Sequence, residues 1–191
     1  MPHPISSFLV APPGMTFEGQ EAGEKVLLLL RAHLITLAPT LLLIAFLLFL
    51  PFLVPFVLSL LEVDLSGFLT AAQTFLIVLF WYLLVFAYTF YRFIFWYFNI
   101  YLLTNERIVD FDFRGLLHKE TSYAKLSQIQ DITPKTIGFF GTFFHYGDIF
   151  IQTAAARTEF EFHHVPKPNE VATRILEEER KEQGEAPGVV S

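Results

Sequence analysis

Two long hydrophobic stretches dominate the first half of the chain. No charged residue occurs from Leu34 to Leu61 or from Leu65 to Tyr91. A helix that crosses a hydrocarbon core of about 30 Å needs about 20 apolar residues, so each stretch is long enough. The pattern therefore predicts two transmembrane helices, over about residues 34–58 and 68–92, joined by a tight acidic turn.

The residues before the first span have a different pattern. Prolines and a glycine interrupt residues 1–20, which are predicted to form a flexible tail. Residues 21–31 lead into the apolar stretch and are predicted to form a juxtamembrane helix, so that the helical part covers 21–97. A signal peptide is not expected, because no basic segment precedes the short apolar run Phe8–Val10.

An aromatic run, residues 90–98, follows the second span. Aromatic rings gather at the membrane–water boundary, where one end of the side chain is wet and the other lies in lipid. We interpret the run as an interfacial belt; a cofactor or sterol site is the alternative. No linker follows it, so the next domain is expected to be held against the membrane.

After this belt the hydrophobic period changes from helical to alternating. Val109, Phe111 and Phe113 alternate with aspartates, and residues 159–163 repeat that alternation. Residues 148–153 are typical of a more fully buried strand. Two prolines then start a C-terminal helix with an apolar stripe, and the predicted domain, 98–183, is a small antiparallel β domain closed by that helix. Residues 184–191 are predicted to form a disordered tail.

Five short motifs follow one another along this half of the chain. They are Tyr101-Leu-Leu-Thr-Asn-Glu-Arg-Ile108, Ser127-Gln-Ile-Gln-Asp-Ile132, Gly138-Phe-Phe-Gly141, Tyr146-Gly-Asp-Ile149 and Val165-Pro166. This series, behind a two-helix hairpin, resembles the membrane-flanked bacterial pleckstrin-homology (PH) domain family, in a short form with one domain. The resemblance covers roughly residues 25–180.

The resemblance implies a membrane α+β fold. A two-helix transmembrane hairpin would be followed by a PH-like antiparallel β-barrel or sandwich, closed by a C-terminal α-helix. It also implies a membrane-associated interaction module. The motif residues are expected to be structural, because they suit turns and close backbone approaches. They are Tyr101, Thr104, Arg107, Gly141, Gly147 and Asp148.

The distribution of charge predicts how the chain is oriented in the membrane and argues against nucleic acid as a partner. The formal net charge is −6 and only 17% of residues are charged, so nucleic acid is not an expected partner. The turn between the spans carries Glu62 and Asp64 but no basic residue, whereas Lys25 and Arg31 precede the first span and Arg92 follows the second. The positive-inside rule then predicts a multi-pass protein of the cell (inner) membrane with both termini in the cytoplasm.

No catalytic or cofactor signature is present in the sequence. The chain has no cysteine, which excludes disulfides and thiolate chemistry. It also lacks a Gly-x-Ser-x-Gly elbow, a phosphate loop and an HExxH motif. Adjacent histidines His163 and His164 would point to opposite faces of a strand, so no metal site is expected there. Gln73, inside the second span, is expected to bond between helices. We predict a protein that is not an enzyme and holds no cofactor.

The predicted function is that of a protein-interaction or complex-assembly module anchored in the lipid bilayer. Its unknown protein partner would add to an exposed strand edge or occupy the groove beside the C-terminal helix. Homo-oligomerisation through the hairpin is a companion hypothesis. The alternative is a sensor of anionic lipid head groups that uses Arg92, Arg107 and Arg114, although carboxylates outnumber basic residues in this half of the chain. No residue supports a third hypothesis, an intramembrane enzyme or transporter.

Overall fold

The computed structural model describes residues 5–62, 69–115, 118–154 and 159–184. The chain divides into two compact units. One combines residues 1–35 with 95–191, and the other is formed by residues 36–94. Most of the predicted acidic turn and of the predicted C-terminal tail lies outside the described residues.

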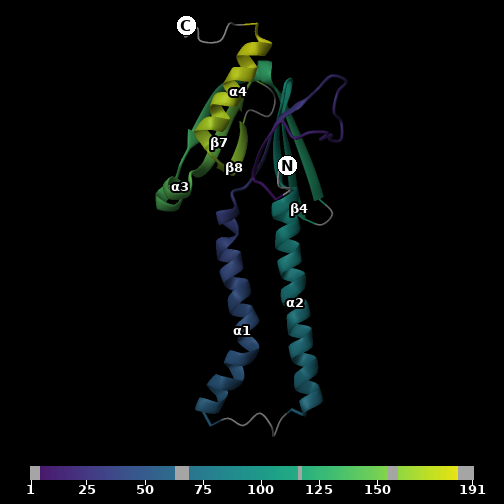
Figure 1. The fold of residues 1–191 in the computed structure, drawn as a ribbon, viewed down its shortest axis with the longest axis vertical. Coiled ribbons are helices and arrows are strands. Elements are labelled where there is room, and N and C mark those ends of the chain that lie inside the picture. The colour runs from purple at the N-terminus through teal and green to yellow at the C-terminus, as the bar shows by residue number, and fades with distance from the viewer. Residues whose placement is uncertain (1–4, 63–68, 116–117, 155–158, 185–191) are drawn as a thin grey trace. The chain divides into compact units, whose positions relative to one another are not determined.

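The first unit contains two antiparallel sheets (Figure 1). The larger has the order β1-β2-β3-β4-β5 and consists of β1 (Phe8–Val10), β2 (Val26–Arg31), β3 (Ile100–Thr104), β4 (Arg107–Gly115) and β5 (His118–Lys125). The smaller has the order β6-β7-β8 and consists of β6 (Ile129–Lys135), β7 (Tyr146–Thr153) and β8 (Glu159–Pro166). The short helices η3 (Leu126–Gln128) and α3 (Gly138–Phe144) precede and follow β6, and α4 (Pro168–Glu182) ends the unit.

The main core lies between the sheets and under α4. Side chains that alternate along the strands fill it, including Ile149, Ile151, Phe160 and Phe162. The apolar stripe of α4 is buried against β6 and β7, which explains why this helix stays on the smaller sheet (Figure 1). In the described residues the strands form two sheets and not the closed barrel that was one of the expected forms.

The N-terminal part of the chain differs from its prediction. A tail was expected over residues 1–20 and a helix over 21–31, but β1 and β2 are strands of the larger sheet. β2 pairs antiparallel with β3, from Val26 opposite Thr104 to Arg31 opposite Ile100. Its leucines 28–30 are buried on both faces, and such a run does not alternate. The apolar helices are therefore inserted between two neighbouring strands.

The second unit, residues 36–94, contains the greater part of the two apolar helical segments, whose outer ends, residues 34–35 and 95–98, belong to the first unit. The short helix η1 (Leu34–Leu37) leads into α1 (Ala38–Leu60), and α2 is Ala71–Phe98. α2 extends beyond the predicted limit of residue 92 because the aromatic run stays helical. α1 and α2 pack antiparallel, joined by hydrogen bonds from Trp81 Nε1 to Leu47 O, from Tyr82 Oη to Leu48 O and from Arg92 Nη2 to Thr40 Oγ1.

Polar and helix-breaking residues of these spans have local roles. Pro51 and Pro55 lie inside α1; the helix continues to Leu60, and Figure 1 shows its axis bending in that half. Gln73 was expected to bond between helices. Instead, its Oε1 accepts the backbone N–H of Thr70 at 2.9 Å, and Thr70 Oγ1 accepts the Gln73 N–H at 3.3 Å, an arrangement that caps the start of α2.

Candidate functional site

The turn between β3 and β4 is built around Thr104. Its buried Oγ1 donates to the Arg107 carbonyl at 2.9 Å and accepts the N–H groups of Glu106 and Arg107 at 3.2 and 3.0 Å. A hydroxyl that satisfies three backbone groups fixes the path of a tight turn. This turn sets the positions of Glu106 and Arg107 at one end of the domain.

Arg107 is held by carboxylates that lie far away in the sequence. Its Nε donates to Glu24 Oε1 at 2.9 Å, and its Nη2 donates to Glu24 Oε2 at 2.8 Å and to the Gly19 carbonyl at 2.6 Å. Nη1 lies 3.7 Å from Glu21 Oε1. The guanidinium also lies over the Tyr123 ring, 5.0 Å from its centroid. The charge of Arg107 is therefore already compensated within the fold.

The same contacts shift two pKa values. Burial would raise the pKa of Glu24, whose side chain has no exposed surface, but hydrogen bonds from Arg107 and the Glu21 N–H outweigh it and lower that pKa. The hydrogen bond to Glu24 likewise raises the pKa of Arg107. The pair is thus a buried, doubly hydrogen-bonded ion pair of the fold.

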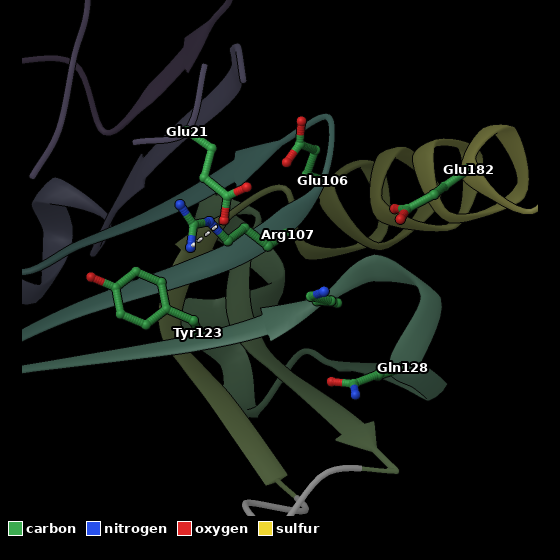
Figure 2. A pocket seen from close by; sticks show the side chains of 7 residues that line it. Glu21, Glu106, Arg107, Tyr123, Gln128 and Glu182 are labelled. Atoms are coloured by element: carbon green, nitrogen blue, oxygen red, sulfur yellow. Dashed lines mark ion pairs between the residues drawn. The ribbon is translucent and has the colours of Figure 1, made fainter. Parts of the chain in front are cut away.

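A pocket of about 390 Å³ opens beside this pair, and we call it the acidic pocket (Figure 2). It lies where the β3–β4 turn, the end of β5, η3 and the C-terminal end of α4 meet. Its lining side chains are Glu21, Glu106, Arg107, Tyr123, Lys125, Gln128 and Glu182. Three carboxylates face two cations, one of which is bound to Glu24.

Within this pocket the pKa of Glu182 is raised above its usual value. Burial, and then the nearby Glu106 carboxylate, raise its pKa, while Lys125 opposes the shift. A raised carboxylate pKa means that the ionised form lacks full compensation. With three carboxylates against two cations in its lining, the acidic pocket has an excess of negative charge.

The three arginines predicted for lipid head groups have separate environments. Arg92 is in the helical unit, where its Nη2 donates to Thr40 Oγ1 at 3.2 Å. Arg107 is bound to Glu24, and Arg114 lies in β4 with a side chain outside the described part of the structure. The carboxylate partners of Arg107 are Glu24 and Glu21, which precede both apolar helices in the sequence. The head-group site stays a prediction.

The remaining motif residues contact the fold itself. The Tyr101 ring stacks on Phe162 at 4.3 Å, and its hydroxyl accepts the His163 N–H at 3.1 Å; burial raises its pKa. A Cβ on Gly147 would overlap the Lys135 carbonyl oxygen, and one on Gly141 would lie 3.1 Å from the Tyr146 carbonyl oxygen.

Asp148 lies close to the two adjacent histidines, His163 and His164. Its Oδ1 accepts the His164 N–H at 2.7 Å, and His164 has a left-handed φ of 53° at an irregularity in the β7–β8 pairing. This bulge places both histidines near Asp148, contrary to the opposite faces expected of a regular strand. Among the described residues, no three His, Asp or Glu side chains are grouped to hold a metal ion.

Sequence reasoning named Arg107 but not the pocket around it. Glu106, Lys125, Gln128 and Glu182 come from the β3–β4 turn, β5, η3 and α4, and no spacing in the sequence connects them. The last turn of α4 carries Arg180 and Lys181 beside Glu182, so its charge pattern gave no signal of a pocket.

Comparisons with known proteins agree with the resemblance. A family described as "Bacterial PH domain" matches residues 32–179. Among solved structures, a DUF1696 family protein with a pleckstrin-homology domain from Shewanella loihica PV-4 is similar at 18% identity. That match covers 43% of this chain and 68% of the other, with a TM-score of 0.30. No curated protein matches.

Proposed function

Because this chain belongs to the bacterial PH domain family, we propose that it is a membrane-anchored module whose domain binds a basic segment of another protein. The family supports a protein or lipid interaction module and is generally non-enzymatic. We accordingly propose that the chain is not an enzyme. A fold does not define its ligand, so the choice of partner has to come from the site.

Anchoring is supported by the two apolar helices. Both are long and apolar enough to cross a membrane, and in their most hydrophobic windows only 0% and 6% of residues are buried. Core helices of a soluble protein would be buried, whereas these present hydrophobic surface outward. The pairing of β2 with β3 supports an even number of crossings, because both strands must lie on one side of the bilayer. The placement of Lys25, Arg31 and Arg92 favours the cytoplasmic side of the cell membrane.

The charge balance of the acidic pocket is the observation that carries the choice of partner. Arg107 is shared between Glu24 and Glu21, and Lys125 is the one other cation in the lining, so the carboxylates of Glu21, Glu24, Glu106 and Glu182 outnumber the two cations. A lysine or arginine of a partner would offset both the burial and the Glu106 charge that raise the pKa of Glu182. The volume of about 390 Å³ suits a few side chains of an extended segment, within the roughly 300–1,000 Å³ of ligand pockets.

A photo-crosslinking experiment in native membranes tests this function. The full chain carries p-benzoylphenylalanine at Gln128, and mass spectrometry maps what it captures. We expect a protein adduct at a segment that contains lysine or arginine. The variant E106K/E182K should reduce its yield about tenfold or more, since hydrogen bonds to charged groups contribute about 1.5–3 kcal/mol each. The control E159K/E177K changes the net charge equally, at exposed positions outside the pocket.

Other outcomes would refute the proposal. An adduct whose yield both charge-reversal variants reduce equally would show non-specific electrostatics. Capture of lipid, with vesicle association that falls as salt rises, would favour the head-group alternative with Arg92, Arg107 and Arg114. Capture of a second copy of this chain alone would favour homo-oligomerisation.

A further inference from the structure

The short helix α3 exposes an unusual concentration of aromatic side chains. Phe139, Phe140 and Phe143 are 75%, 63% and 63% exposed, and Ile137, directly before the helix, is 64% exposed. We call these four residues the aromatic cap. The phenylalanine rings of the cap contact one another: those of Phe139 and Phe143 stack with centroids 5.9 Å apart. Only Gly141 of α3 is buried, so the helix contributes little to the core.

The cap is fixed to the domain by its small residue. Gly141 lies so close to the chain that a Cβ there would be 3.4 Å from the Thr136 methyl group. His145 ends the helix in a left-handed conformation, and the chain then enters β7. Singly scattered apolar residues on a surface need no explanation, but four adjacent ones on a fixed support indicate a surface that is covered in use.

The cap lies at the end of the domain from which the chain passes to the apolar helices. Tyr146, two residues after α3, stacks its ring on His33 with centroids 5.5 Å apart. The His33 N–H donates to the His164 carbonyl at 2.7 Å. Trp96 Nε1 donates to the Ala32 carbonyl at 2.9 Å. This hydrogen bond joins the segment that leads into the first apolar helix to the end of the second. All of these residues belong to the same compact unit.

We infer that the aromatic cap inserts into the interfacial layer of the bilayer that α1 and α2 cross, as a third attachment point of the domain. The inference rests on the proposed anchoring. The cap lies in the same compact unit as residues 32–35 and 95–98, where the chain enters and leaves the candidate spans. This position identifies lipid as the material that covers the cap. Phenylalanine favours this depth, and Lys135, two residues before Ile137, suits the anionic head groups above it.

A fluorescence experiment on the full chain tests the insertion. The natural chain has no cysteine, so single cysteines can carry an environment-sensitive dye without further changes. T142C reports on the cap, F86C on α2 and E177C on α4, since all three positions are exposed. Each labelled chain is reconstituted into vesicles of phosphatidylethanolamine and phosphatidylglycerol. Quenching by spin-labelled lipid is then compared with quenching by aqueous iodide.

The expected result is lipid quenching at positions 142 and 86 and iodide quenching at 177. Lipid quenching at 86 with iodide quenching at 142 would overturn the insertion and leave the anchoring intact. Iodide quenching at both would overturn the anchoring. Protection at 142 from both quenchers would mean that protein covers the cap, which also overturns the inference.

A second variant tests whether the phenylalanine side chains themselves cause the insertion. F139S/F140S/F143S in the T142C background removes three apolar side chains, and iodide quenching at 142 should rise at least about tenfold. The control L176S removes an exposed leucine on α4 and should change nothing. Unchanged emission of Trp96, measured with W81F in every variant, verifies that the domain is folded. Continued lipid quenching at 142 in the triple variant would refute the role of these rings.

Discussion

The ion pair between Arg107 and Glu24 provides the sharpest test of how this domain is held together. R107M keeps an unbranched apolar side chain of similar length and removes the guanidinium. The Glu24 carboxylate, which has no exposed surface, would then keep the Glu21 N–H but lose both hydrogen bonds from Arg107. The change therefore leaves a buried charge largely uncompensated.

The expected loss of stability follows from the burial of the pair. Removing one partner of a buried ion pair costs about 3–5 kcal/mol, and loss of the contact with the Tyr123 ring adds about 0.5–1 kcal/mol. Because Arg107 retains 15% exposure, we expect a total of about 3–4 kcal/mol. Domains of this kind have about 5–15 kcal/mol of stability in all, so R107M would be marginally folded. R107M/E24M, which removes both charges, should recover most of the loss.

Urea unfolding of the full chain in lipid nanodiscs measures this difference. Trp96 is a suitable probe because it is buried in the domain and bonded to the Ala32 carbonyl. W81F removes the other tryptophan, which lies in α2. A loss below about 1 kcal/mol, the value of an exposed pair, would refute the assignment of Arg107 to the fold. Unchanged stability with lost vesicle binding would instead favour the head-group sensor.

Three further predictions concern the same unit. G147A should unfold the domain or cost at least about 3 kcal/mol, because the added Cβ overlaps the Lys135 carbonyl oxygen, while G115A, with open space around it, should cost below about 1 kcal/mol; both are measured by urea unfolding. The lowered pKa of Glu24 means that its contribution is present above the unfolded value of 4.5 and is lost as pH falls through the folded value; an acid titration of E24Q should therefore be flatter below pH 4.5 than that of the natural chain. A fragment of residues 98–191 should show no cooperative unfolding transition, because it lacks β2; a sharp transition would contradict the described sheet.

The sequence predicted the elements whose hydrophobic period was clear. The two charge-free stretches gave the helical pair, and the alternation around Val109 and Phe160 gave strands of the two sheets. β2 was missed because a short run of leucines, buried on both faces, has no alternation and adjoins a helical stretch. Leucine also has a high helix propensity, which tertiary pairing with β3 overrides here.

The candidate site was less accessible to such reasoning. Arg107 belonged to a recognised motif, but its partner Glu24 lies 83 residues earlier, before both apolar helices. Local patterning offers only carboxylates on the same hairpin. The acidic pocket depends on where α4 ends relative to the β3–β4 turn, which is a property of packing and not of spacing. The cap on α3 was read as a glycine motif, since the exposure of its rings is visible only in three dimensions.

The insertion of α1 and α2 between β2 and β3 also fixes the order of assembly. β2 is synthesised before either helix, and β3 follows about 70 residues later. In a free chain, closing a loop of that length costs about 2–3 kcal/mol more than closing a short turn. Pairing of α1 with α2 shortens that loop before the strands meet. Substitutions that loosen the helix pair, at Tyr82 for example, should therefore slow the folding and lower the stability of a sheet that they do not touch.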